Sequence, residues 1–86
     1  MYRLKITRAT GEVSEHDITP RIEYLFELHT KKGFHKAFRE DEKQGDLYYL
    51  AWECLKATGE TVKIFGVDFL DTLKEVNVLY DEQPLS

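Results

Sequence analysis

The residue types best suited to metal or acid–base chemistry are three histidines and one cysteine, and they are scattered along the chain. His16, His29 and His35 have no second histidine or cysteine three or four residues away, and Cys54 has no other cysteine to pair with. Zinc and similar metals need nitrogen and sulfur ligands at close, regular spacing. We therefore expect no metal site and no bound cofactor.

The sequence also lacks a pattern of residues for nucleophilic catalysis. The only serines are Ser14 and Ser86, and neither lies in a Gly-x-Ser-x-Gly turn. Cys54 follows Glu53, and this negative neighbour should raise the pKa of the thiol and leave the cysteine inert. Because no pattern joins an acid, a base and a nucleophile, we predict that the chain is not an enzyme and has no catalytic residues.

Composition narrows the class of protein and the class of partner. The 86 residues are 42% hydrophobic, which predicts a packed core in a single domain spanning residues 1–86. The formal charge is −4, and residues 46–86 hold three basic and eight acidic side chains. Generic binding to nucleic acid or to anionic membranes needs clustered lysine and arginine. Neither partner is expected.

The sequence also bears on the compartment. It has no run of about 18 apolar residues, so we expect no membrane span. The first residues alternate between apolar and polar and lack the apolar segment of a signal peptide. A lone cysteine is typical of a reducing compartment. These features favour the cytoplasm.

The predicted elements begin with a hairpin over residues 1–18. Tyr2, Leu4 and Ile6 alternate with polar residues, which is the period of a half-buried strand. Gly11 follows as a turn residue, and the second strand, with poorer alternation, is expected at the edge of the sheet. An isolated hairpin is barely stable, so its apolar face should lie on helices.

Helices are predicted over residues 20–32, 46–58 and 67–75. Thr19 and Pro20 open the first, Gly33 closes it, and Asp46 is the expected cap of the second. Residues 34–45 are expected to form a solvated connection with one or two helical turns, or a partner-recognition loop. Residues 76–80 are a short strand or an extended tail, and residues 81–86 a mobile tail. The predicted fold class is therefore α+β, with an N-terminal β-hairpin packed on about three α-helices and a short extended C-terminal tail.

Dense aromatic residues in the second half are the candidates for contact with a partner protein. Adjacent helical residues point about 100° apart, so Tyr48 and Tyr49 cannot both face the core. Tyrosine and tryptophan are also enriched at binding hot spots. The candidate partner-binding residues are Tyr48, Tyr49, Trp52, Phe65 and Phe69. The alternative is that all five are core residues.

These aromatic residues form part of a longer pattern. The helix Leu-Tyr-Tyr-Leu-Ala-Trp-Glu-Cys-Leu-Lys of residues 47–56 precedes Thr58-Gly59, and Phe65 and the run Phe-Leu-Asp-Thr-Leu of residues 69–73 follow. With Val76 and the acidic ending, this pattern resembles the small tail assembly chaperones of long-tailed, siphovirus-type bacteriophages. The specific part of the resemblance covers about 30 residues, and the charged stretch of residues 39–43 has no clear correspondence.

The resemblance implies a non-enzymatic viral protein of the host cytoplasm. Such chaperones bind the tape measure protein, keep its hydrophobic helices soluble during tail morphogenesis, and are displaced as tail tube proteins arrive. A domain this small has a thin core, so a homo-oligomer is a further expectation. The alternative function is a small acidic protein-binding inhibitor, or a nucleic-acid mimic, acting on a host factor. An exposed apolar patch would favour the chaperone, and regularly spaced surface carboxylates would favour the mimic.

Overall fold

The N-terminal hairpin forms as the alternating pattern predicts. In the computed structural model, which describes residues 2–37 and 43–80, strand β1 (Tyr2–Arg8) pairs with strand β2 (Val13–Asp17) in an antiparallel register. Gly11 supplies the left-handed conformation of the turn, with φ of 94°. Strand β2 lies at an edge because β1 is the central strand of the sheet.

Residues 76–80 form a strand, one of the two alternatives expected for them, but this third strand is longer than predicted and corrects the helix before it. A helix was expected over residues 67–75, but α4 (Val67–Leu70) is a single turn and strand β3 (Leu73–Tyr80) begins three residues later. Pairing between strands explains why these residues form a strand and not the expected helix. Strand β3 lies antiparallel to β1, with Ile6 opposite Val76 and Leu4 opposite Val78, and so satisfies the second edge of β1. The sheet order is β2-β1-β3, and the predicted α+β class is confirmed.

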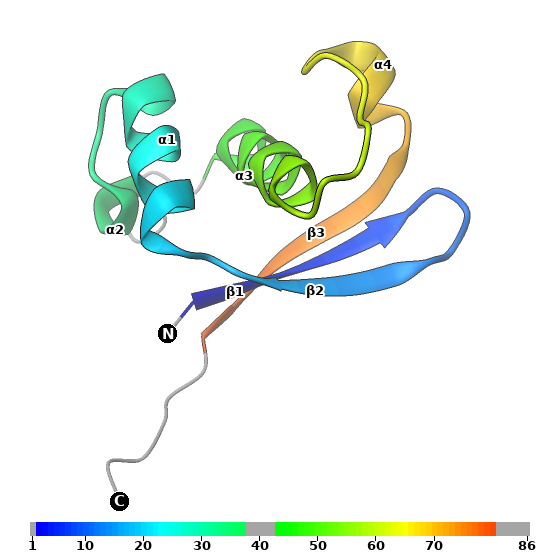
Figure 1. Ribbon diagram of the computed structural model, residues 1–86, viewed down its shortest axis with the longest axis horizontal. Coiled ribbons are helices and arrows are strands. Elements are labelled where there is room, and N and C mark those ends of the chain that lie inside the picture. The colour runs from blue at the N-terminus through cyan, green and yellow to red at the C-terminus, as the bar shows by residue number, and fades with distance from the viewer. Residues whose placement is uncertain (1, 38–42, 81–86) are drawn as a thin grey trace, which may run out of the picture.

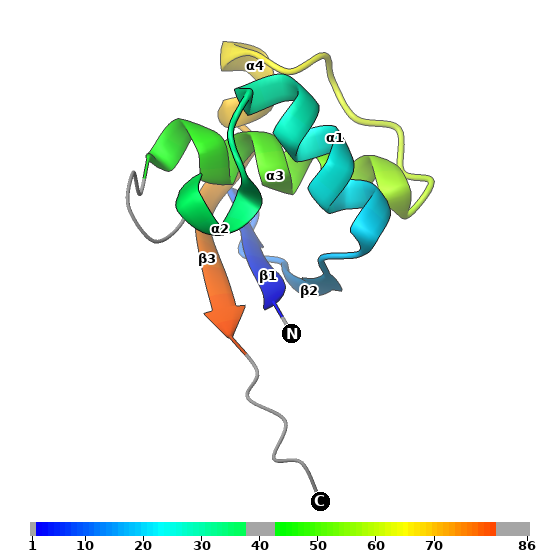
Figure 2. The ribbon, with the colours of Figure 1, turned by 90° about the vertical axis from the view of Figure 1, so that its left-hand side faces the viewer.

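Helices cover one face of the sheet (Figure 1 and Figure 2). Helix α1 (Pro20–Thr30) begins after Thr19, whose hydroxyl accepts from the Ile22 amide at 3.3 Å. It ends two residues before its predicted end, because Lys31 and not Gly33 takes the left-handed cap, with φ of 64°. One further turn, α2 (Phe34–Lys36), follows. Residues 38–42 and the predicted mobile tail at 81–86 lie outside the described residues.

Helix α3 (Gln44–Ala57) forms the centre of the core. It begins two residues before the predicted start, and the expected cap, Asp46, lies instead in its first turn, 3.2 Å from the ammonium of Lys32. Its buried stripe meets the inner faces of β1 and β3 and the apolar face of α1. The fully buried side chains from these elements include Leu4, Ile6, Phe26, Leu50, Cys54 and Leu55, and Phe69 of α4 joins them.

The described part of the chain contains no helix with the length and apolarity needed to cross a bilayer.

A substitution at Leu50 tests whether α3 forms the centre of the core. Its side chain is fully buried, so Leu50→Ala should lower the free energy of unfolding by about 2–5 kcal/mol, because it leaves a cavity that the core cannot fill. Leu28→Ala is the matched control, since Leu28 is 49% exposed on α1, and it should change stability by less than about 1 kcal/mol. Urea unfolding followed by circular dichroism measures both. Equal losses would contradict the assigned core.

Candidate functional site

Four of the five predicted contact residues form one aromatic cluster. Tyr49 and Trp52 come from α3, and their ring centroids lie 5.6 Å apart. Phe65 approaches both rings, at 5.3 Å from Tyr49 and 5.9 Å from Trp52, and lies 6.1 Å from Phe69. The fifth residue, Tyr48, is half-buried and packs against the core. The cluster therefore joins α3 to the segment that connects it to α4.

Burial divides the cluster into an inner and an outer part. Tyr49 and Phe69 are buried in the core, whereas Trp52 and Phe65 are half-buried at its margin. Of the two adjacent tyrosines, Tyr49 is thus the inner one. The side chains of Trp52 and Phe65 are therefore accessible to a partner, while those of Tyr49 and Phe69 pack beneath them.

Trp52 fastens the segment after α3 to the helix. Its indole nitrogen donates a hydrogen bond to the Lys63 carbonyl at 2.8 Å. The ammonium of Lys56, one turn along α3, lies 3.8 Å from the centre of the Trp52 ring, which is a cation–π contact. The Trp52 side chain therefore has a hydrogen-bond acceptor at its indole nitrogen and a cation over the face of its ring.

Beside Trp52 the surface is hollowed and apolar. The hollow has a volume of about 370 Å³, and we call it the Trp52 groove; it is lined by Trp52, Lys56, Gly59, Glu60, Thr61, Val62, Lys63 and Ile64. Ile64 is 88% exposed, and Val67, three residues on, is 72% exposed. Val67 is not among the lining residues, so the exposed apolar side chain that lies beside the indole is Ile64, an arrangement typical of an interaction site. The sequence singled out neither residue.

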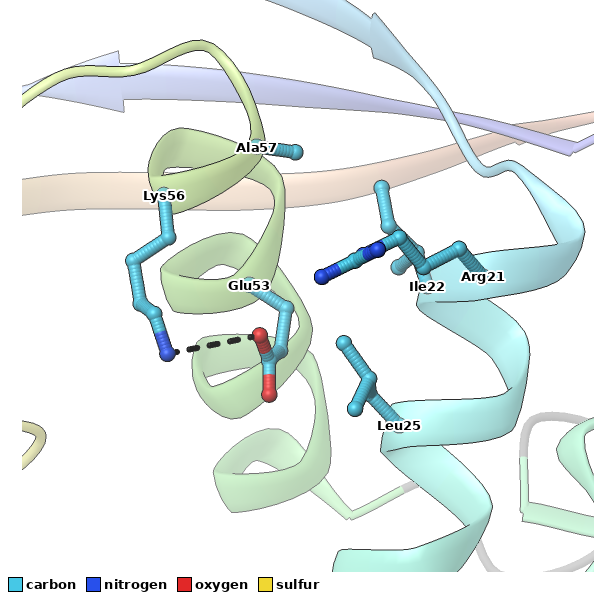
Figure 3. A pocket seen from close by; sticks show the side chains of 6 residues that line it. All are labelled: Arg21, Ile22, Leu25, Glu53, Lys56 and Ala57. Atoms are coloured by element: carbon cyan, nitrogen blue, oxygen red, sulfur yellow. Dashed lines mark ion pairs between the residues drawn. The ribbon is translucent and has the colours of Figure 1, made fainter.

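A buried carboxylate lies on the α1 side of the same helix. Glu53 is 6% exposed and borders a pocket of about 140 Å³ between α1 and α3, into which the Arg21 side chain also points (Figure 3). The Tyr49 hydroxyl donates to Glu53 at 2.5 Å, and the Lys56 ammonium lies 3.7 Å from its other oxygen. Burial, and then the bond to Glu53, raise the pKa of Tyr49, which keeps the hydroxyl a donor. This carboxylate is thus satisfied from within the fold.

A second polar cluster occupies the inner face of strand β2. The Ser14 hydroxyl and Nε2 of His16 lie 2.8 Å apart, an arrangement that the sequence analysis missed because it comes from alternate residues of a strand. Nearby, the Arg8 guanidinium donates to Glu60 at 2.9 Å. Burial, followed by the charge of Arg8, lowers the pKa of His16. Among the described residues no carboxylate hydrogen-bonds to His16, so the pair lacks the orienting member of a catalytic triad.

His29 and Cys54 have structural surroundings. The ring of His29 stacks on Tyr49, with centroids 3.7 Å apart and an angle of 7°. Cys54 is buried, and burial, with the charge of Glu53 second, raises the pKa of its thiol to about 12. An inert thiol was expected from the sequence. Within residues 2–37 and 43–80, no three histidine, cysteine or acidic side chains are grouped to hold a metal ion.

Comparisons of the chain with protein-family models, with curated proteins and with solved structures found no match.

The bond between Trp52 and Lys63 can be tested by Trp52→Phe. The variant keeps an apolar ring but loses the indole donor, so the free energy of unfolding should fall by about 0.5–1.5 kcal/mol. Tyr48→Phe is the matched control, because within the described residues the Tyr48 hydroxyl makes no hydrogen bond. Urea unfolding of the two variants gives the comparison. A loss no larger than that of the control would mean that the bond does not hold the segment in place.

The lowered pKa of His16 predicts that the stability of the fold depends on pH. Its pKa in the folded chain is below the ordinary value of 6.5, so the unfolded chain takes up the proton first as the pH falls. The stability associated with neutral His16 is present above about pH 6.5 and declines below it. Unfolding curves of the wild type and of His16→Gln between pH 7.5 and 5 should therefore converge on acidification. Parallel dependence on pH would contradict the half-buried, neutral state of His16.

Proposed function

We propose that this protein is a non-enzymatic tail assembly chaperone of a long-tailed bacteriophage, which binds the tape measure protein and keeps it soluble. The observation that carries the proposal is the exposed apolar surface after α3, formed by Ile64 in the Trp52 groove, 88% exposed, and by Val67 three residues on, 72% exposed. A chaperone for hydrophobic helices needs a surface of this kind. The resemblance of residues 47–73 to the chaperone family supplies the identity of the partner.

The size of the surface suits transient binding. Burying an isoleucine or a valine side chain contributes about 1.5–3 kcal/mol each, while association costs at least about 4 kcal/mol in lost translational and rotational freedom. Two such anchors with a half-buried indole therefore give a modest net affinity for one helical segment. A chaperone that later yields its client to tail tube subunits requires such reversible contacts.

The charge distribution argues against the alternative of an acidic inhibitor or nucleic-acid mimic. A mimic needs carboxylates that are free to meet a basic target. Here some of the sixteen acidic residues already have arginine or lysine partners: Arg3 pairs with Glu15 at 3.0 Å and Asp17 at 2.8 Å, Arg8 with Glu60 at 2.9 Å, and Lys32 with Asp46 at 3.2 Å. The exposed apolar surface has no place in the mimic hypothesis, whereas the chaperone hypothesis requires it.

Co-expression with a phage tape measure protein tests the proposal. The wild-type chain should keep the tape measure soluble and co-purify with it. Val67→Asp and Ile64→Asp should reduce the co-purified fraction at least about tenfold, since a buried unpaired charge costs more than 1.4 kcal/mol. Val13→Asp is the matched control: Val13 is also an exposed valine, at 51%, but lies on β2 opposite Thr7, on the face of the sheet away from the helices.

Two results would contradict the proposal. One is a tape measure protein that is equally soluble without the chain and forms no complex with it. The other is equal loss of the complex in the Val67 and Val13 variants, which would show that the exposed surface after α3 has no special part in binding.

A further inference from the structure

The Trp52 groove has a charge opposite to that of the protein around it. Residues 46–86 contain only three basic side chains against eight acidic ones. Two of the three, Lys56 and Lys63, line this one groove, while Lys74 belongs to strand β3. In a chain of net charge −4, this placement makes a local basic site over an apolar floor.

The acidic residues near the groove do not cancel this charge. The carboxylate of Glu60 is bound by Arg8 at 2.9 Å. Glu53 is buried on the α1 side of α3, accepts from Tyr49, and lies 3.7 Å from Lys56. Within the described part of the chain, Lys63 is exposed and has no ion-pair partner. At least one lysine is thus free to meet a carboxylate from outside.

The walls of the groove also limit the backbone form of the ligand. The Lys63 carbonyl already accepts from the Trp52 indole at 2.8 Å, so one of the backbone acceptors that an added strand would use has a partner within the fold. A helix needs no such pairing, because its own backbone groups are satisfied within it. Helices commonly bind in grooves through apolar anchors one turn apart.

We propose that the Trp52 groove binds an amphipathic helix that inserts an apolar anchor beside Trp52 and carries carboxylates next to that anchor. This inference rests on the proposed function and specifies the chemistry of the client segment. The anchor meets Trp52 and Ile64, and the flanking carboxylates meet Lys63 and Lys56. Segments with basic residues around the same anchor are rejected by like charge.

Trp52 makes the test direct, because it is the chain's single tryptophan and its fluorescence reports on the groove itself. The probes are three synthetic helical peptides without tryptophan, with identical leucine anchors flanked by glutamate, glutamine or lysine. In low-salt buffer, the glutamate peptide should bind the full chain about fivefold more tightly than the glutamine peptide, the size expected for one or two exposed ion pairs. The lysine peptide should bind most weakly. Salt should reduce these differences.

Three variants separate the effect of the groove from general electrostatics. Lys63→Gln should bring the three affinities closer together, and Lys56→Gln with Lys63→Gln should make them nearly equal. Lys74→Gln removes the same charge from strand β3, outside the groove, and should leave the order of affinities unchanged. Circular dichroism of each variant shows that it is folded.

The outcomes distinguish this inference from the proposed function. No binding by any peptide, equal binding by all three, or preference for the lysine peptide would each overturn the inference, even if the tape measure protein still co-purifies. Conversely, the predicted preference without any tape measure complex would leave the groove's specificity in place and overturn the chaperone assignment.

Discussion

The packing of α3 on the sheet is the constraint on which the rest of the structure depends. One helix covers the inner faces of β1 and β3, and its buried stripe consists of Leu50, Ala51, Cys54 and Leu55. Helix α3 has six buried residues, against two in α1 and two in β1. The direction of α3 therefore determines where α1 can pack and where the chain emerges after Ala57.

The two flanks of α3 have different chemistry, and Lys56 links them. Towards α1, Tyr49 donates to the buried Glu53. Towards the segment after the helix, Trp52 donates to Lys63. Lys56 lies 3.8 Å from the Trp52 ring and 3.7 Å from Glu53. A charge inside the helix interface thus helps to hold the cation that borders the groove, so that the packing of the core and the character of the binding surface are connected through a single side chain.

Local patterns predicted the elements whose cause is local. Alternation over Tyr2–Ile6 and the Gly11 turn give the hairpin, and the capping hydroxyl of Thr19 starts α1 where expected. The helix predicted over residues 67–75 failed because its apolar spacing fits a helix or a strand equally well, and only the open edge of β1 favours the strand. Asp46 was wrongly expected to cap α3 because its partner, Lys32, is distant in sequence.

The candidate site shows the same division between features with a local cause and features that depend on the tertiary structure. The sequence alone determined that the second half is rich in aromatic residues, acidic overall and without a catalytic pattern, because residue types and charge do not depend on the fold. Only the tertiary structure decided which aromatic residues stay accessible, that Ile64 and Val67 are exposed, and that two of the few lysines meet at one groove. Burial and local charge depend on which segments the packing of α3 brings together, and that information is not local in the sequence.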